Sequence, residues 1–134
     1  MRNKKKVIAA IIHKNNKFLL AQRAKKDVLY QKWEFPGGKL ELNETYEECL
    51  KRELYEEFGI IATIGDYLCS SYFEYNEELY EMLAFFVPTF QGNFILYEHS
   101  AIAWVSVDKL YMYEVPEPDK PIIEALSKKF GTGS

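Results

Sequence analysis

The chain has 134 residues, of which 48% are hydrophobic and 28% charged, as in an ordinary globular protein long enough to bury a core. Its net charge of −3 argues against nonspecific binding to nucleic acid, which requires a basic surface. The sequence has no apolar run of 18 residues and only two cysteines, so we expect no membrane span and no disulfide framework, and a cytoplasmic location.

The first third of the chain predicts a strand hairpin followed by a glycine-containing loop. Residues 7–12 and 18–22 are apolar runs of strand length, and a polar turn at residues 14–16 separates them. A polar loop follows at residues 24–31, and residues 35–42 contain two adjacent glycines. His13 lies at a strand end, where we expect a structural role.

The next segment predicts an amphipathic helix. Thr45 and Glu48 have the spacing of a capping box, so the helix should begin there. Gly59 can adopt the left-handed conformation that ends a helix. One stripe of this helix is apolar and is expected to be buried: Leu50, Leu54 and Phe58.

Three glutamates lie on one arc beside that stripe: Glu53, Glu56 and Glu57. Carboxylates at these spacings repel each other and lower helix stability. A hard divalent cation such as Mg²⁺, or Mn²⁺ in its place, would neutralise them, because both prefer oxygen ligands. The carbonyl of Gly37 is a further candidate ligand, since glycine allows the backbone to approach an ion closely.

The rest of the chain predicts more strands and a second helix. The expected β segments are residues 60–74, 79–90, 94–97 and 101–105, with a turn at 76–78 and an edge or bulge at Pro88. A helix is expected at residues 120–130, opened by Pro121. This order favours an α/β fold in which helices flank a mixed sheet. We expect one domain at residues 1–130 and a disordered tail at 131–134.

The glutamate-rich helix also carries a spaced motif. Its fixed positions are Gly38, Glu44, Arg52, Glu53, Leu54, Glu56, Glu57, Gly59 and Ile60. At these positions the chain resembles the Nudix hydrolase family. Residues 21–23 and 33–39 resemble the MutT-like branch, whereas residues 98–101, Trp104 and residues 116–126 resemble its CTP pyrophosphohydrolase members. The resemblance implies an α/β/α sandwich with a central mixed β-sheet.

The resemblance also implies a set of catalytic roles. It makes Glu53, Glu56 and Glu57 metal ligands. Arg52 would pair with Glu44 or Glu56 and so orient the carboxylates. Glu98 is either a loop carboxylate facing solvent or, by resemblance, a metal ligand or general base. Whether Glu53 or Glu98 takes the proton of the attacking water stays open.

Candidate substrate contacts lie outside the helix. Arg23 resembles a phosphate contact, although a surface ion pair would also account for it. Phe35 is the best candidate to line a base pocket, and Tyr75 is a weaker one. Asp119 resembles a base-reading residue, with the capping of the last helix as its alternative role. An ionised Asp119 would accept from the amine of cytosine, whereas a protonated one would also donate and could suit an oxidised purine.

The sequence thus predicts a Mg²⁺-dependent nucleoside triphosphate pyrophosphohydrolase that releases a monophosphate and pyrophosphate. The expected substrates are (d)CTP-type pyrimidine nucleotides or oxidised purine nucleotides such as 8-oxo-dGTP. A Nudix fold used only as a binding or regulatory module is the alternative, and the intact motif favours the enzyme. The partner is a small nucleotide rather than nucleic acid or a membrane, and the protein is a monomer or a homodimer.

Overall fold

The computed structural model describes residues 5–131. Apart from Gly131, the tail expected at residues 131–134 lies outside this range. The strands are β1 (Lys5–Lys14), β2 (Lys17–Arg23), β3 (Trp33–Glu34), β4 (Gly37–Lys39), β5 (Ile61–Thr63), β6 (Tyr67–Tyr75), β7 (Glu78–Val87), β8 (Thr89–Gln91) and β9 (His99–Ser106). The helices are α1 (Tyr46–Phe58) and α2 (Lys120–Phe130), with short 3-10 turns η1 (Val107–Met112) and η2 (Glu117–Asp119).

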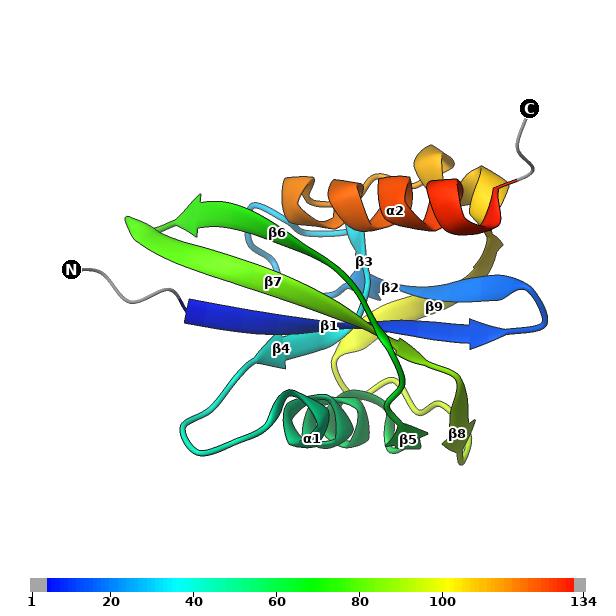
Figure 1. Cartoon of the computed structure of the whole chain (residues 1–134), viewed down its shortest axis with the longest axis horizontal. Coiled ribbons are helices and arrows are strands. Elements are labelled where there is room, and N and C mark those ends of the chain that lie inside the picture. Colours follow the sequence, from blue (N-terminus) through cyan, green and yellow to red (C-terminus); the bar gives the residue numbers. More distant parts are fainter. Residues whose placement is uncertain (1–4, 132–134) are drawn as a thin grey trace.

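Seven of the nine described strands form a mixed sheet between the two α-helices (Figure 1), and β5 and β8 form a separate two-stranded sheet. The order of the mixed sheet is β3-β2-β1-β7-β6, with β4 paired to β1 and β9 paired to β2. Strands β1 and β7 are parallel, and the other pairs in this sheet are antiparallel. The helices α1 and α2 cover opposite faces, which confirms the α/β/α sandwich with a central mixed sheet.

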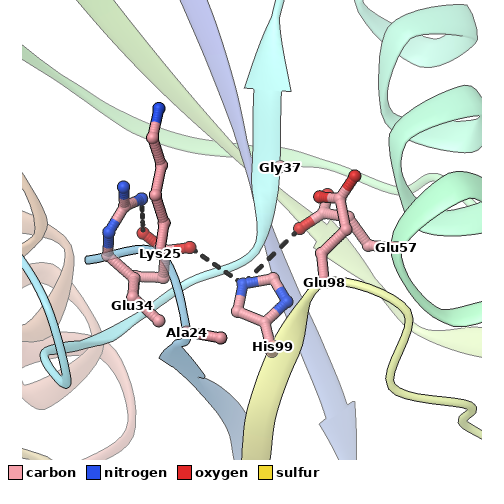
Figure 2. A pocket seen from close by; sticks show the side chains of 8 residues that line it. Ala24, Lys25, Glu34, Gly37, Glu57, Glu98 and His99 are labelled. Atoms are coloured by element: carbon pink, nitrogen blue, oxygen red, sulfur yellow. Dashed lines mark hydrogen bonds and ion pairs between the residues drawn. The ribbon is translucent and has the colours of Figure 1, made fainter. Parts of the chain in front are cut away.

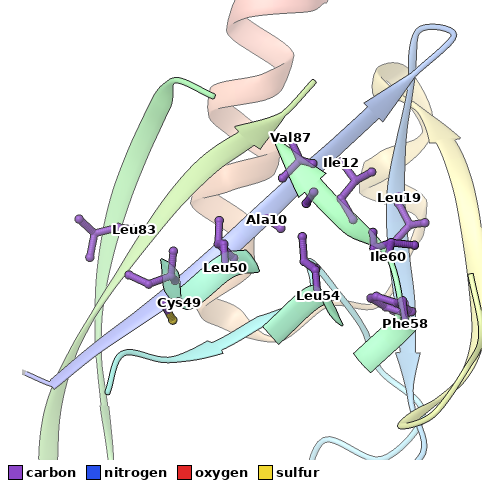
Figure 3. Close-up of a cluster of buried hydrophobic side chains, with 13 residues drawn as sticks. Ala10, Ile12, Leu19, Cys49, Leu50, Leu54, Phe58, Ile60, Leu83 and Val87 are labelled. Carbon is purple, nitrogen blue, oxygen red and sulfur yellow. The ribbon is translucent and has the colours of Figure 1, made fainter. Parts of the chain in front are cut away.

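The core divides into two clusters because side chains alternate along the central strands. On β1, Ile8 and Ala10 belong to the cluster beneath α1 (Figure 3), whereas Ala9 and Ile11 belong to the cluster beneath α2. The expected apolar stripe of α1 is fully buried: Leu50, Leu54 and Phe58. The sheet is therefore buried on both faces. The apolar stripe of α1 packs against one face of the sheet, and the acidic arc of the helix lies beside this packed stripe.

Strand β1 changes its neighbour along its length. Its residues 7–9 pair with β4, and its residues 13–14 pair with β2. Between these two pairings, the Ala10 N–H donates to the carbonyl of Pro36, which lies between β3 and β4. The ends of β2, β3, β4 and β9 consequently meet near the middle of β1, on the side where α1 ends.

Both ends of α1 are as predicted. Thr45 accepts from the Glu48 N–H while the Glu48 side chain accepts from the Thr45 N–H, which completes the capping box. Gly59 ends the helix with a left-handed φ of 72°. No helix among residues 5–131 is long and apolar enough to cross a bilayer.

Some strand predictions were wrong in extent. The segment predicted at residues 60–74 divides into β5 and β6 around Gly65, and the one at 79–90 divides into β7 and β8 at Pro88. The strand predicted at 94–97 does not form. Instead, the N–H groups of Ile95 and Tyr97 donate to the carbonyls of Phe58 and Glu57 at the end of α1. These N–H groups therefore donate to the free carbonyls at the helix end instead of to a neighbouring strand.

Candidate active site

A cavity of about 570 Å³ opens where the strand ends meet the end of α1 (Figure 2). It is lined by Arg23, Ala24, Lys25, Glu34, Gly37, Glu57, Glu98 and His99. These residues come from β2 and the loop after it, from β3, β4 and α1, and from the junction where the loop before β9 enters that strand. The cavity combines cationic and anionic side chains, as a site for a charged ligand would.

The three glutamates on the arc of α1 differ in exposure. The side chain of Glu57 is 3% exposed, that of Glu53 is 17% exposed and that of Glu56 is 52% exposed. Only Glu57 lines the cavity directly. Among residues 5–131, no three acidic, His or Cys side chains are gathered into a preformed metal cluster. The arc therefore brings carboxylates to the edge of the cavity, but their side chains do not surround a common metal position.

Burial controls the protonation of the innermost carboxyl. It raises the pKa of Glu57 to about 10, with the nearby charge of Glu53 adding to the effect. Oε2 of Glu57 is buried and has no hydrogen-bond partner among the described residues. An oxygen in this state is costly unless a cation or donor satisfies it. The donor set of carboxylates around this oxygen fits a hard divalent cation.

Arg52 organises the outer carboxylates. Its Nε and Nη2 donate to the two oxygens of Glu44 over 2.7 and 3.0 Å. Its Nη1 donates to Glu53 over 2.8 Å and to Glu56 over 3.4 Å. Both partners predicted for Arg52, Glu44 and Glu56, are thus in contact with it, and Glu53 is a third. The guanidinium holds the pKa of Glu44 down at about 2.

The paired glycines allow two close approaches. A Cβ at Gly37, whose φ is 151°, would collide with the Ile8 carbonyl of β1. A Cβ at Gly38 would collide with the carboxyl of Glu53. The absence of side chains therefore lets Glu53 lie directly against the β4 backbone. Gly37, whose carbonyl was predicted to be a metal ligand, lines the cavity.

Glu98 is exposed and lies next to Glu57, on the same side of the cavity (Figure 2). The hydrogen bond from the Tyr97 N–H to the Glu57 carbonyl, 3.2 Å long, ties the residue before Glu98 to the end of α1. The ring of Tyr97 lies where a Cβ at Gly59 would come into van der Waals contact with it. Glu98 and Glu57 are therefore brought together although 41 residues of sequence separate them.

His99 and Glu34 belong to the cavity although neither was among the predicted site residues. His99 is buried, its ring stacks on Phe58, and its Nε2 lies 2.9 Å from Glu34 Oε2 and 3.7 Å from Glu57 Oε1. The register that pairs His99 with Arg23 across β2 and β9 brings it inward.

Arg23 is held by two carboxylates. Its Nη1 donates to Glu34 over 3.1 Å and its Nη2 donates to Asp27 over 2.7 Å. The ion pair considered as the alternative for Arg23 is thus present, and the residue nevertheless lines the cavity. Its Nε is buried without a hydrogen-bond partner among the described residues.

Asp119 and Phe35, the two main candidates for base recognition, contact each other through the backbone of Phe35. The Phe35 N–H donates to Asp119 Oδ2 over 2.9 Å, and complete burial raises the pKa of Asp119 to about 8. The carboxyl makes no cap hydrogen bond to α2, which contradicts the capping alternative. The ring of Phe35 is 4% exposed and belongs to the core, so it offers no open face to a base. Tyr75 is 51% exposed at the end of β6 and does not line the cavity.

The NUDIX domain family model matches residues 3–126. The chain belongs to the Nudix hydrolase family. This Nudix hydrolase is 40% identical over 119 residues to the CTP pyrophosphohydrolase of Escherichia coli K12, covering 89% of this chain and 88% of that one. It is 34% identical over 123 residues to an 8-oxo-dGTP diphosphatase of Buchnera aphidicola subsp. Schizaphis graminum, covering 91% and 92% of the two chains.

The fold agrees with that assignment. The solution structure of the Escherichia coli ORF135 protein matches this Nudix hydrolase with a TM-score of 0.88 and 36% identity, over 98% of this chain and 96% of that one. Nudix hydrolases act on small nucleotides and generally use divalent cations. Both properties suit a cavity that has carboxylates on one side and cations on the other.

Proposed function

We propose that this Nudix hydrolase cleaves nucleoside triphosphates to monophosphate and pyrophosphate with Mg²⁺ as its cofactor, Mn²⁺ serving as a substitute. Its ligands would be Glu53, Glu56 and Glu57, with the Gly37 carbonyl, and Glu98 would serve either as a further ligand or as the general base. A phosphoanhydride resists attack because its oxygens are negative, and a bound divalent cation neutralises them and activates a water. The partnerless Oε2 of Glu57 supports a cation at this edge of the cavity.

Glu98 is the better candidate to accept the proton of the water. The carboxylate of Glu53 accepts from Arg52 and lies against Gly38. Glu98, by contrast, is exposed in the cavity and accepts no hydrogen bond from any residue between 5 and 131. A general base has to reach the proton that it removes, and the less restrained carboxylate can do so. Arg52 and Glu44 would orient the ligands without taking part in proton transfer.

The substrate proposal rests on one observation, the buried Asp119 carboxyl that accepts from the Phe35 N–H. Burial raises the pKa of this carboxyl to about 8, so it is mostly protonated at neutral pH and carries a donor beside an acceptor, although Asp119 is buried and is not among the residues that line the cavity. Cytosine offers the complementary pair, an acceptor at N3 and a donor at its amine. The Hoogsteen edge of 8-oxoguanine also offers one donor and one acceptor, whereas that of guanine offers two acceptors.

A protonated Asp119 suits both cytosine and 8-oxoguanine, and of the two we favour CTP-type pyrimidine triphosphates, with 8-oxo-dGTP as the main competitor. The name of the E. coli relative, a CTP pyrophosphohydrolase, supports this order. The test is a panel of CTP, dCTP, 5-methyl-dCTP, UTP, dGTP and 8-oxo-dGTP, scored by pyrophosphate release with Mg²⁺ and with EDTA. Cytosine nucleotides should be turned over fastest, and EDTA should abolish turnover. Binding of these nucleotides without turnover would mean a binding module, which contradicts the proposal.

A further inference from the structure

Lys25 forms part of the cavity wall that faces the proposed metal ligands. Figure 2 shows its side chain on the Glu34 side of the cavity, opposite Glu57 and Glu98. Arg23 is the other cation lining this cavity. A polyphosphate lying across the cavity would thus meet a cation-binding edge at one side and basic side chains at the other.

The two basic residues differ in how far their charge is already neutralised. Both terminal nitrogens of Arg23 are paired, one with Glu34 and one with Asp27. Lys25 forms no ion pair with any residue in the described part of the chain, and its side chain is exposed. Lys25 is therefore the basic residue of this cavity that is free to take a new anionic partner.

The backbone that carries Lys25 is held in place. The carbonyl of Lys25 accepts from the Asp27 N–H over 3.0 Å. The carboxylate of Asp27 in turn accepts from the Leu29 N–H over 2.9 Å and from Arg23. The loop after β2 thus closes on itself through Asp27, so the base of the Lys25 side chain has a defined position on the cavity wall.

Lys25 lies on the Glu34 side of the cavity (Figure 2), and the contacts across the site run from Asp119 through Glu34 to the proposed metal ligands. Asp119 contacts Phe35, the residue that follows Glu34, and Glu34 is the last residue of β3. Glu34 contacts Arg23 on one side and His99 on the other, and Glu57 lies beyond His99. A nucleotide whose base reaches Asp119 and whose outer phosphates reach Glu57 would set its nucleoside-linked phosphate near Lys25.

We propose that Lys25 binds the phosphate group that stays on the nucleoside, and so contributes to affinity for both the triphosphate substrate and the monophosphate product. This assignment rests on the proposed function, because it takes the base and metal ends of the site from it. The ammonium group is a compact charge on a flexible stem, suited to following a phosphate from substrate to product. Pyrophosphate, which would leave from the metal side, should not depend on Lys25.

The test compares Lys25→Met with Lys26→Met. The first substitution keeps most of the stem and removes the charge, and the second makes the same change at the neighbouring exposed lysine, which does not line the cavity. Isothermal titration calorimetry with Mg²⁺ measures the binding of CMP and of inorganic pyrophosphate to each variant. We expect Lys25→Met to weaken CMP binding about tenfold, the effect of losing one contact of about 1.4 kcal/mol, and to leave pyrophosphate binding unchanged.

Two results would overturn the assignment: equal CMP affinity in the two variants, or a loss for pyrophosphate as large as the loss for CMP. Circular dichroism of both variants checks that the fold is intact. Turnover of CTP by the unmodified protein is measured alongside. A failure of the proposed function appears there, in the unmodified protein, whereas a failure of the Lys25 assignment appears only in the comparison of the two variants.

Discussion

The guanidinium of Arg52 makes a two-point contact with the carboxylate of Glu44, through Nε over 2.7 Å and through Nη2 over 3.0 Å. This contact joins the loop before α1 to the middle of the helix. The remaining nitrogen, Nη1, is thereby aimed at Glu53 and Glu56. Arg52 does not line the cavity, but its ion pairs can in this way fix the position of the proposed metal ligands Glu53 and Glu56.

Glu44→Gln should therefore lower activity without unfolding the protein. Loss of one charged partner lets Arg52 rotate, and changes of this kind in residues that support metal ligands cost about tenfold to hundredfold in activity. Steady-state kinetics against Mg²⁺ concentration measure the effect. Glu47→Gln is the matched control, because among residues 5–131 the one ion pair of Glu47 is with Lys51 on the helix surface. Equal kinetics in the two variants would show that the Arg52–Glu44 contact does not support the site.

Glu57→Gln should abolish stabilisation by metal. The amide keeps the shape of the buried side chain and removes the charge that a cation would neutralise. Scanning calorimetry of the unmodified protein should show a higher Tm in excess Mg²⁺ than in EDTA, because a ligand that binds only the folded state stabilises it. The variant should show little difference. Glu124→Gln, an exposed change on α2, should behave as the unmodified protein does. A full Mg²⁺-induced rise in the Glu57 variant would remove Glu57 from the ligand set.

Asp119→Ala should impair the preferred nucleotide more than the poor ones. Loss of a buried reader costs about 1–3 kcal/mol, roughly tenfold to hundredfold in kcat/KM. The measurement is kcat/KM for CTP and for UTP in each variant. Glu117→Ala serves as the control, since Glu117 lies on the same turn but is exposed and pairs with Lys120. A uniform loss over all nucleotides would assign base recognition to other residues.

The stability of the protein should fall with rising pH because of Asp119. Its folded-state pKa of about 8 lies above the ordinary value of 3.8. Between these values the folded state retains a proton that the unfolded chain has released, so the free energy of unfolding falls by up to about 1.4 kcal/mol per pH unit and levels off above pH 8. Urea unfolding of the unmodified protein and of Asp119→Asn measures this. Their difference should change across that range, and a constant difference would contradict the assignment.

Local patterns sufficed to predict α1 because its caps and its apolar stripe are encoded within 15 residues, Thr45 to Gly59. The carboxylates on that helix could be predicted for the same reason. Glu34, His99 and Lys25 could not, since their place in the cavity depends on the pairing of β2 with β3 and β9. The available signals were Glu34, three residues before Gly37, and His99, directly after Glu98.

The contact between Phe35 and Asp119 spans 84 positions. Resemblance to a family pointed to Asp119, and a position beside the glycine turn pointed to Phe35. No local pattern distinguishes a ring that faces a ligand from one that faces the core. Packing beneath α2 turned the ring of Phe35 inward and left its backbone N–H to hold the carboxyl. The segment at 94–97 was predicted wrongly for a related reason, because the carbonyls at the end of α1 take its hydrogen bonds.

The products of CTP hydrolysis test the central claim most directly. Phosphorus-31 NMR of a reaction in ¹⁸O-labelled water identifies the products and the phosphorus that receives the water oxygen. The account predicts CMP and pyrophosphate when Mg²⁺ is present and no reaction in EDTA, with ¹⁸O in the pyrophosphate if the β-phosphorus is attacked. CDP and orthophosphate as the main products, or turnover that persists in EDTA, would contradict it.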